Sequence, residues 1–268
     1  MAYNELNINM VGIGKLGIDV ANYVQFRHSC IKNVIALASD EDIILAQTED
    51  KYSSYYSLKM KLFEFENTDC INIVTVDASE RYECSLAANV CETFAMMNKP
   101  CMCIAVMPIK IGEPYYNATV NLDQIDTAQC AIVRLENNLY KDVCDVVFRI
   151  IYSFAECADD TALVRVDLNE LASDMTGKYL FTSGYMDDIT AKAASEYIVS
   201  ALENYAPFKR CDTVLIFAEV GNNLTEHVLD VLRDNFLSAN DFADVKVFAH
   251  TSDEHTALEG IVSIFARM

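Results

Sequence analysis

The sequence has no apolar run that approaches the ~20 residues that a helix needs to cross a bilayer. Its first ten residues, MAYNELNINM, lack a basic segment followed by an apolar core, so no signal peptide is predicted. The 10 cysteines include no C-x-x-C pair, and the sequence shows neither repeats nor low-complexity stretches. We therefore expect a cytoplasmic protein with reduced thiols.

Basic residues are scarce. The 268 residues include 20 Lys and Arg against 40 Asp and Glu, which gives a formal charge of −20. Such a surface repels nucleic-acid phosphates and anionic lipid headgroups, so neither nucleic acid nor membrane is an expected partner. The same surface suits divalent cations and basic protein surfaces.

Two groupings of metal-ligand residue types are present, and neither predicts a metal site. Cys101 and Cys103 alternate along an apolar run, which places both on one face of a strand as ordinary buried thiols. His250, Asp253 and His255 cluster near the end of the chain, where a surface loop explains them more simply.

The first half alternates short β-rich runs with helical patterns such as Ile18–Gln25 and Leu86–Met97. Near-continuous apolar strands separated by helices predict a parallel sheet covered on both faces. The candidate strands are Leu6–Val11, Val34–Ala38, Cys70–Val76, Met102–Met107 and Ala131–Leu135.

A long amphipathic helix is predicted at Leu139–Cys157. Its apolar residues recur at helical spacing and form a stripe too broad for a surface helix, which predicts one continuous helix packed between two sheets. The residues of this stripe are Val143, Val146, Val147, Ile150, Ile151 and Phe154.

The second half predicts a smaller sheet backed by helices, and we expect no terminal tail after its last strand. The predicted domains are therefore 1–138, a central helix at 139–158, and 159–268. The expected elements are helix Leu168–Met175, strand Lys178–Ser183, helix Asp188–Tyr205, strand Thr213–Val220, helix Leu224–Leu237 and strands Asp244–His250 and Gly260–Ala266.

A glycine motif, VGIGKLGIDV, places Gly12, Gly14 and Gly17 in a G-x-G-x-x-G pattern between a strand and a helix. A helix N-terminus offers free N–H groups to a phosphate, and Asp40 follows at the distance of a ribose-binding acid. Taken alone, the motif fits either an NAD-binding Rossmann site or a purely structural glycine turn.

The whole chain, from about Asn7 to Arg267, resembles the FtsZ/tubulin superfamily. INMVGIGKLGIDVANYV is similar to the opening strand, glycine loop and helix of that family, and IALASDEDIILAQ to the strand that follows. VDLNELASDM and GKYLFTSGYMDDITAKAASEYIVSALEN resemble segments beyond its central helix. The resemblance implies an α/β fold with a parallel-sheet nucleotide-binding domain, a central helix, a smaller C-terminal α/β domain, and GTP or GDP with Mg²⁺ as ligands.

The departures from the family fall on its phosphate loops. FtsZ carries glycines after the strand that corresponds to Cys70–Val76. This chain reads DASERYECSLAANVCE there, and a second glycine-rich loop is missing after Asp40. Such a segment is more often an ordinary polar connection than a remodelled binding site. The family's glycine positions are occupied here by Lys15, Leu16 and Ile18 in the first loop and by Ser79, Glu80, Arg81, Glu83 and Ser85 in this one.

These replacements predict weak nucleotide binding. Losing two charge-assisted contacts would remove ~3–6 kcal/mol, roughly a 100- to 10,000-fold loss of affinity. Glu80 and Glu83 add negative charge near the phosphate site, and only Lys15 and Arg81 could compensate. The family's base-binding asparagine becomes Cys144, next to a retained aspartate. The candidate nucleotide-binding residues are Gly12, Gly14, Lys15, Gly17, Asp40, Arg81 and Asp145.

Acidic residues after the central helix of FtsZ act on the nucleotide of the next subunit, and the matching positions here are Asp167 and Glu170, with Arg165 in place of an asparagine. Asp-x-x-Glu ahead of an apolar helix is also a capping box, which alone accounts for both acids.

Two functions from different classes follow. The first is an FtsZ-like protein with a degraded nucleotide site that works by protein–protein association, with an authentic FtsZ or with itself, in cell division or the cytoskeleton. The second is a divergent, filament-forming GTPase. A Rossmann protein that binds NAD is a lesser alternative.

Overall fold

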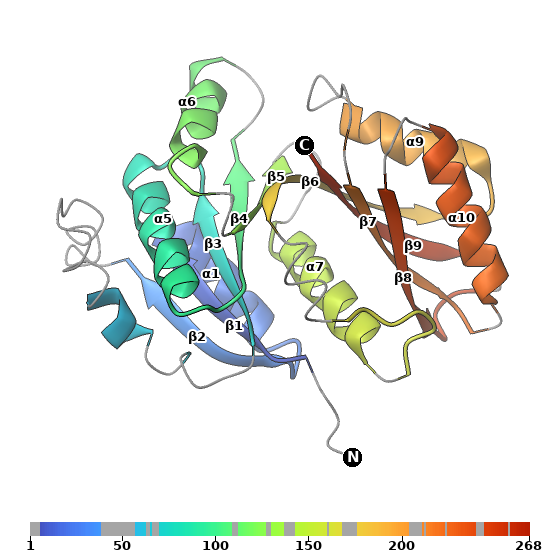
Figure 1. The fold of residues 1–268 in the computed structure, drawn as a ribbon, viewed down its shortest axis with the longest axis horizontal. Helices are drawn as coiled ribbons and strands as arrows, with labels where there is room; N and C mark the ends of the chain where they lie inside the picture. Colours follow the sequence, from blue (N-terminus) through green and yellow to red (C-terminus); the bar gives the residue numbers. More distant parts are fainter. Residues whose placement is uncertain are drawn as a thin grey trace. The chain divides into compact units, whose positions relative to one another are not determined.

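A computed structural model describes residues 6–38, 57–62, 65, 70–108, 112–126, 130–136, 143–159, 161–167, 176–203, 211, 213–222, 224–239, 244–256 and 258–268. These elements form two compact units (Figure 1). The N-terminal unit comprises Leu6–Arg149 and Asn169–Lys178, and the C-terminal unit is built mainly from Ile150–Leu168 and Tyr179–Met268. The limits 138 and 158 that the sequence suggests for the domains remain a proposal.

The N-terminal unit is built on a parallel sheet, as the apolar strands predict. Each strand begins or ends within three residues of its predicted limits, and neighbouring strands are parallel throughout. In spatial order, the strands are β2 (Ile31–Leu37), β1 (Ile8–Ile13), β3 (Ile71–Asp77), β4 (Cys101–Met107) and β5 (Ala131–Glu136).

Helices cover both faces of this sheet (Figure 1). Side chains alternate along β3, so Val74 and Val76 join the core beneath α5 (Arg81–Met96), whereas Thr75 faces α1 (Gly14–Gln25). The sheet therefore has two apolar faces, which explains why its strands read as continuous hydrophobic runs.

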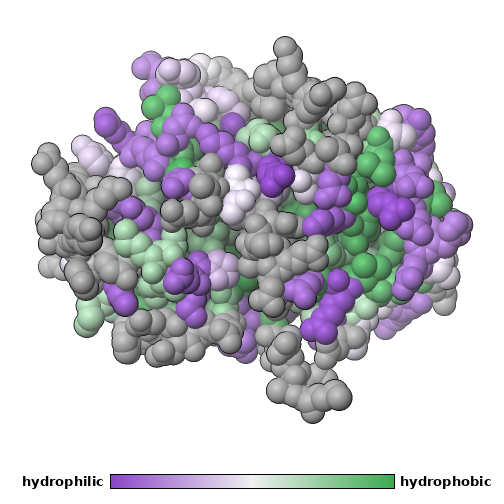
Figure 2. Space-filling model, in the orientation of Figure 1, coloured by the Kyte–Doolittle hydropathy of each residue, from purple (hydrophilic) through white to green (hydrophobic). Residues whose placement is uncertain are grey.

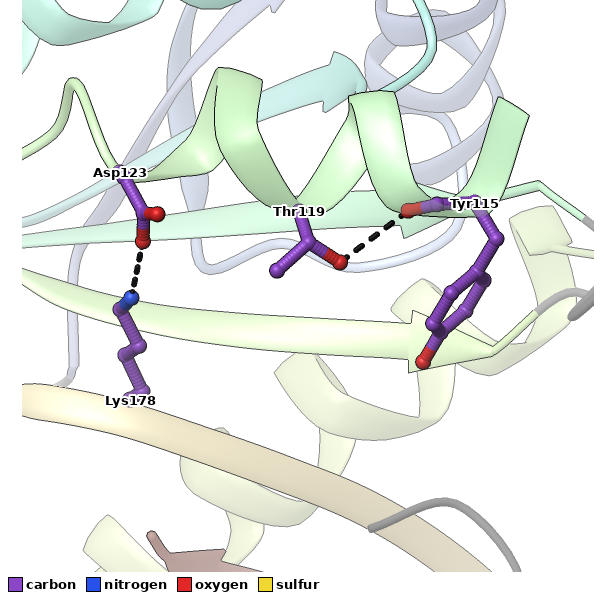
Figure 3. Close-up of polar contacts among 4 residues, drawn as sticks. All are labelled: Tyr115, Thr119, Asp123 and Lys178. Carbon is purple, nitrogen blue, oxygen red and sulfur yellow. Dashed lines mark hydrogen bonds and ion pairs between the residues drawn. The ribbon is translucent and has the colours of Figure 1, made fainter. Parts of the chain in front are cut away.

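Helix α6 (Glu113–Leu122) was not predicted, because only Ala118, Asn121 and Leu122 of its residues are buried. Proline in its first turn and Gly112, whose φ of 73° lies in the left-handed region, mark its start. Figure 3 shows the Lys178 ammonium pointing to the Asp123 carboxylate just beyond the helix, at 2.6 Å. Both side chains are substantially exposed, so the ion pair adds little stability.

The C-terminal unit has a mixed sheet in the order β6 (Gly177–Met186), β9 (Gly260–Arg267), β7 (Thr213–Gly221) and β8 (Asp244–Ser252). Strand β9 is antiparallel to both neighbours, and β7 and β8 are parallel. Helices α9 (Lys192–Glu203) and α10 (Glu226–Ala239) share an apolar core with this sheet. This is the smaller, helix-backed sheet that the sequence predicts.

Helix α7 (Val143–Ala158) runs without a break through the described part of the predicted central helix. Its Phe154 ring lies 4.9 Å from the ring of Phe217 and 5.2 Å from that of Phe265, on the C-terminal sheet. In its first turn, Asp145 accepts a hydrogen bond from the Tyr23 hydroxyl of α1. Leu139 and the next three residues lie outside the described ranges.

Two other predicted helices have different outcomes. The helix expected at Asp188–Tyr205 begins later, at Lys192, because the Asp188 carboxylate accepts hydrogen bonds from the amide and hydroxyl of Thr190 and so holds a turn. The helix expected at Leu168–Met175 lies outside the described residues.

Hydrophilic side chains cover most of the described surface on the face drawn in Figure 2, with smaller hydrophobic areas between them. None of the helices in the described ranges has the length and apolarity that a membrane span requires.

Candidate functional site

The three glycines of the first loop do two different things. A Cβ atom on Gly12 would lie 2.6 Å from the carbonyl oxygen of Gly17, and one on Gly17 would lie 2.2 Å from that of Thr75. Both glycines therefore let α1 approach the sheet closely, and the Thr75 hydroxyl donates to the Gly17 carbonyl at 3.0 Å. Gly14 has φ +66° and makes the turn between β1 and α1.

A second turn lies beside the first, because β1 and β3 are adjacent parallel strands whose carboxyl ends meet at one edge. There the Asp77 carboxylate accepts hydrogen bonds from the amide and hydroxyl of Ser79, at 2.9 and 2.7 Å. Helix α5 starts at Arg81, and neither Glu80 before it nor Ile13 before α1 caps its helix with a side-chain hydrogen bond. Two helix N-termini, which favour anions, therefore open at this edge.

The Glu83 carboxyl lies directly against the glycine turn. A Cβ atom placed on Gly14 would be 2.0 Å from both Cδ and Oε1 of Glu83. The Oε2 atom is shielded from water and has no hydrogen-bond partner among the described residues. This chain therefore holds its own carboxyl group against the loop that resembles a phosphate-binding turn.

Burial, together with the smaller effects of the Asp77 and Glu80 carboxylates, raises the pKa of Glu83 from its ordinary value of 4.5 to about 7. The carboxyl group is therefore partly protonated at neutral pH. A neutral carboxyl tolerates the loss of water and the acidic neighbours that a carboxylate would not.

Replacing Glu83 with glutamine should remove a pH dependence of stability. The unfolded chain titrates this group at about 4.5 and the folded chain at about 7, so the stability it contributes is complete below pH 4.5 and is lost as the pH rises through 7. The full shift is worth roughly 3 kcal/mol, which we reduce to about 1–2 kcal/mol because the side chain is only partly buried and solvent screens its charge.

Urea unfolding of wild type and Glu83→Gln at pH 5, 6, 7 and 8 measures this effect. The free energy of unfolding of wild type relative to the variant should fall between pH 5 and 8. Parallel curves would show that Glu83 titrates as an ordinary exposed acid.

We compared the sequence and the structure with those of known proteins. No family model matches the sequence, and no curated protein matches it. Solved structures do match, over 98% of this chain. An FtsZ of M. jannaschii matches with a TM-score of 0.72 and 15% sequence identity, and 91% of its chain is covered. CetZ1 from Haloferax volcanii, bound to GDP, matches with a TM-score of 0.63 and 12% identity, and 94% of its chain is covered. TubZ of Bacillus thuringiensis serovar israelensis, in GDP-form protofilaments, matches with a TM-score of 0.68 and 10% identity, and 88% of its chain is covered.

The chain has an FtsZ/tubulin-like fold. The resemblance read from the sequence is confirmed at the level of fold, including the mixed α/β architecture.

Within the FtsZ-like fold, the other nucleotide-site candidates on the N-terminal unit have separate environments. Lys15 and Arg81 are exposed at the first residues of α1 and α5. Asp145 is exposed and bonded to Tyr23, and Cys144 beside it is half-buried. Asp40 lies outside the described residues. The structure thus brings together Gly14 and Glu83, whereas Asp145 contacts Tyr23.

Of the two candidate catalytic acids, Asp167 belongs to the C-terminal unit. Asp167 is exposed, and the segment before it is fixed to the end of α7 because the Val166 amide donates to the Cys157 carbonyl at 2.8 Å. The Arg165 guanidinium donates to the carbonyl of Ala158 at 3.1 Å. Glu170 lies outside the described residues, so the capping box stays a prediction.

The surface loop that the sequence predicts for His250, Asp253 and His255 is wrong for His250, whereas Asp253 and His255 do lie in the turn that follows β8. His250 is buried on β8, and Nε2 of His255 lies 3.3 Å from Oε1 of Glu219, with side chains only 8% and 11% exposed. Asp253 instead accepts a hydrogen bond from Asn222. Within the described ranges, these residues do not form a group of metal-ligand atoms. The apolar strands β8 and β9, which flank this turn, were the sequence signal that could have predicted its packing against the sheet.

Proposed function

We propose that this chain is an FtsZ/tubulin-like protein that works by associating with other proteins in a cell-division or cytoskeletal context. It binds nucleotide weakly or not at all. The observation that carries the proposal is the Glu83 carboxyl group against Gly14. A phosphate brought to this turn meets an acid where the family has a glycine, with Asp77 and Glu80 adjacent.

Three features of this turn oppose the binding of a triphosphate. The carboxyl group must move, it ionises above pH 7, and the loop residues of α5 lack the glycine conformations that bring several amides onto one anion. Gly14 is the one residue of the two loops that keeps a left-handed φ. The remaining favourable features are two helix N-termini and the ammonium and guanidinium of Lys15 and Arg81.

Those favourable features support a second candidate, a divergent GTPase that forms filaments. With a pKa near 7, Glu83 can be neutral when an anion arrives, and two cationic residues stand at the starts of α1 and α5. The solved structures of similar fold include an FtsZ dimer and TubZ protofilaments in GDP and GTPγS forms. Self-association with bound GTP and Mg²⁺ is the corresponding proposal for this chain. The NAD-binding alternative gains no support from Asp40, which lies outside the described residues.

Charge decides between self-association and association with a different subunit. Head-to-tail stacking of the family kind would bring Asp167 and Glu170 of one copy toward the glycine turn of the next, where Glu80 and Glu83 add negative charge. Like charges that meet at an interface oppose association by several kcal/mol when desolvated. We therefore propose that the face from Arg165 to Glu170 binds a subunit with an intact nucleotide pocket, such as an authentic FtsZ.

Sedimentation with and without GTP, followed by mixing with an authentic FtsZ, tests this proposal. We expect no GTP-dependent pellet from this protein alone and a changed GTPase rate of the FtsZ. Asp167→Ala combined with Glu170→Ala should abolish the change, whereas Asp123→Ala, an exposed acid on the N-terminal unit, should preserve it. GTP-dependent filaments of this protein alone would favour the second candidate. An FtsZ GTPase rate that is unchanged by this protein would rule out an authentic FtsZ as its partner.

A further inference from the structure

Three cysteines of the N-terminal unit converge on one point. The Sγ atom of Cys91 lies 3.7 Å from that of Cys101 and 3.5 Å from that of Cys130. All three sulfur atoms fall within 4.8 Å of one another. The side chains are at most 4% exposed, so the group is enclosed in the protein core.

The topology explains this convergence, which the chain positions alone conceal. The register that pairs Met102 with Ala131 places Cys101, the first residue of β4, beside Cys130, which immediately precedes β5. Their face of the sheet is covered by α5, which contributes Cys91 from its buried stripe. The thiols lie where these strands begin, at the edge opposite the glycine turn, so they are separate from the site described above.

We propose that Cys91, Cys101 and Cys130 form a three-thiolate site for a soft, thiophilic metal ion, and that Cu(I) is the ion that fits it. Thiolate sulfur is the preferred ligand of Cu(I) and also binds Zn²⁺. Three sulfurs bound to one ion at ~2.3 Å in a trigonal plane lie ~4.0 Å apart. The observed separations of 3.5 and 3.7 Å therefore need little rearrangement to accept an ion.

The number of donors favours Cu(I) over Zn²⁺. Structural zinc sites almost always have four ligands, whereas Cu(I) is satisfied by three sulfurs. Among the described residues, only these three sulfurs lie within 4.8 Å of one another; Cys103 has its thiol next to Cys91 but outside that spacing. The surrounding core is apolar and closed, so water is a poor fourth ligand. Each thiol releases its proton to solvent as its Cu–S bond forms, and no electron is transferred.

Competition for Cu(I) tests the proposal on the full chain. The reduced protein is titrated under anaerobic conditions against a chromogenic Cu(I) chelator, with Cys91→Ser and Cys157→Ser as variants. Cys157 is also fully buried but belongs to the C-terminal unit, so its serine variant is a matched control. We expect one tight Cu(I) per chain, kept by Cys157→Ser and weakened at least about 100-fold in Cys91→Ser, since even outer-shell changes cost 10–100-fold.

X-ray absorption of the Cu(I)-loaded wild type keeps the test independent of how well the variants fold. Three sulfur neighbours and no nitrogen or oxygen are expected. Equal Cu(I) affinity in Cys91→Ser and wild type would overturn the assignment of these ligands. A wild type that binds no Cu(I), or that exchanges it for Zn²⁺ in equimolar competition, would overturn the Cu(I) site.

Discussion

Replacing Gly17 with alanine should lower the free energy of unfolding by about 2–3 kcal/mol. The new Cβ atom would lie 2.2 Å from the backbone oxygen of Thr75, so either α1 or β3 must move. Overpacking of this kind typically costs ~1–3 kcal/mol, and a clash with backbone falls at the upper end because no side chain can rotate away. Alanine is the better helix former by ~1 kcal/mol, which offsets only part of the cost.

Gly184→Ala is the matched control, because a Cβ atom there would meet only the Ile198 side chain at 3.6 Å, an ordinary contact. Urea unfolding followed by circular dichroism measures both variants against wild type. If Gly17→Ala were as stable as Gly184→Ala, the close packing of α1 on the sheet would be wrong.

The sequence predicted the elements of the fold well where burial is uniform. Strands such as Ile71–Asp77 and Cys101–Met107 are covered on both faces and read as continuous apolar runs, so their patterns were unambiguous. The helix at Glu113–Leu122 buries three residues and left too weak a pattern to detect. The start of α9 depended on the Asp188 turn, a side-chain effect that hydrophobic periodicity does not carry.

The candidate site was predictable as a location but not as a geometry. The sequence placed an acid at a family glycine position, and the structure adds that the Glu83 carboxyl lies against Gly14 with its Oε2 atom shielded from water. That contact joins residues from two different loops, so no local spacing signals it. The thiol group was missed for the same reason, because strand register, and not sequence separation, brings Cys101 beside Cys130.

The largest expected effect is on nucleotide affinity. Compared with an authentic FtsZ, this chain should bind GTP roughly 100- to 10,000-fold more weakly, because ~3–6 kcal/mol of charge-assisted contacts is absent. Above pH 7 the ionised Glu83 adds repulsion. One pair of like charges at 4 Å costs ~1 kcal/mol even in bulk water, so Glu83→Gln should bind GTP about fivefold or more tightly than wild type at pH 8.

Equilibrium binding of labelled GTP and GDP with Mg²⁺, to wild type and Glu83→Gln at pH 8, shows whether the Glu83 carboxyl group excludes nucleotide. We expect that wild type binds neither nucleotide up to millimolar concentration and that any gain in affinity appears in the variant. Micromolar binding of GTP by the wild type, unchanged in Glu83→Gln, would contradict it.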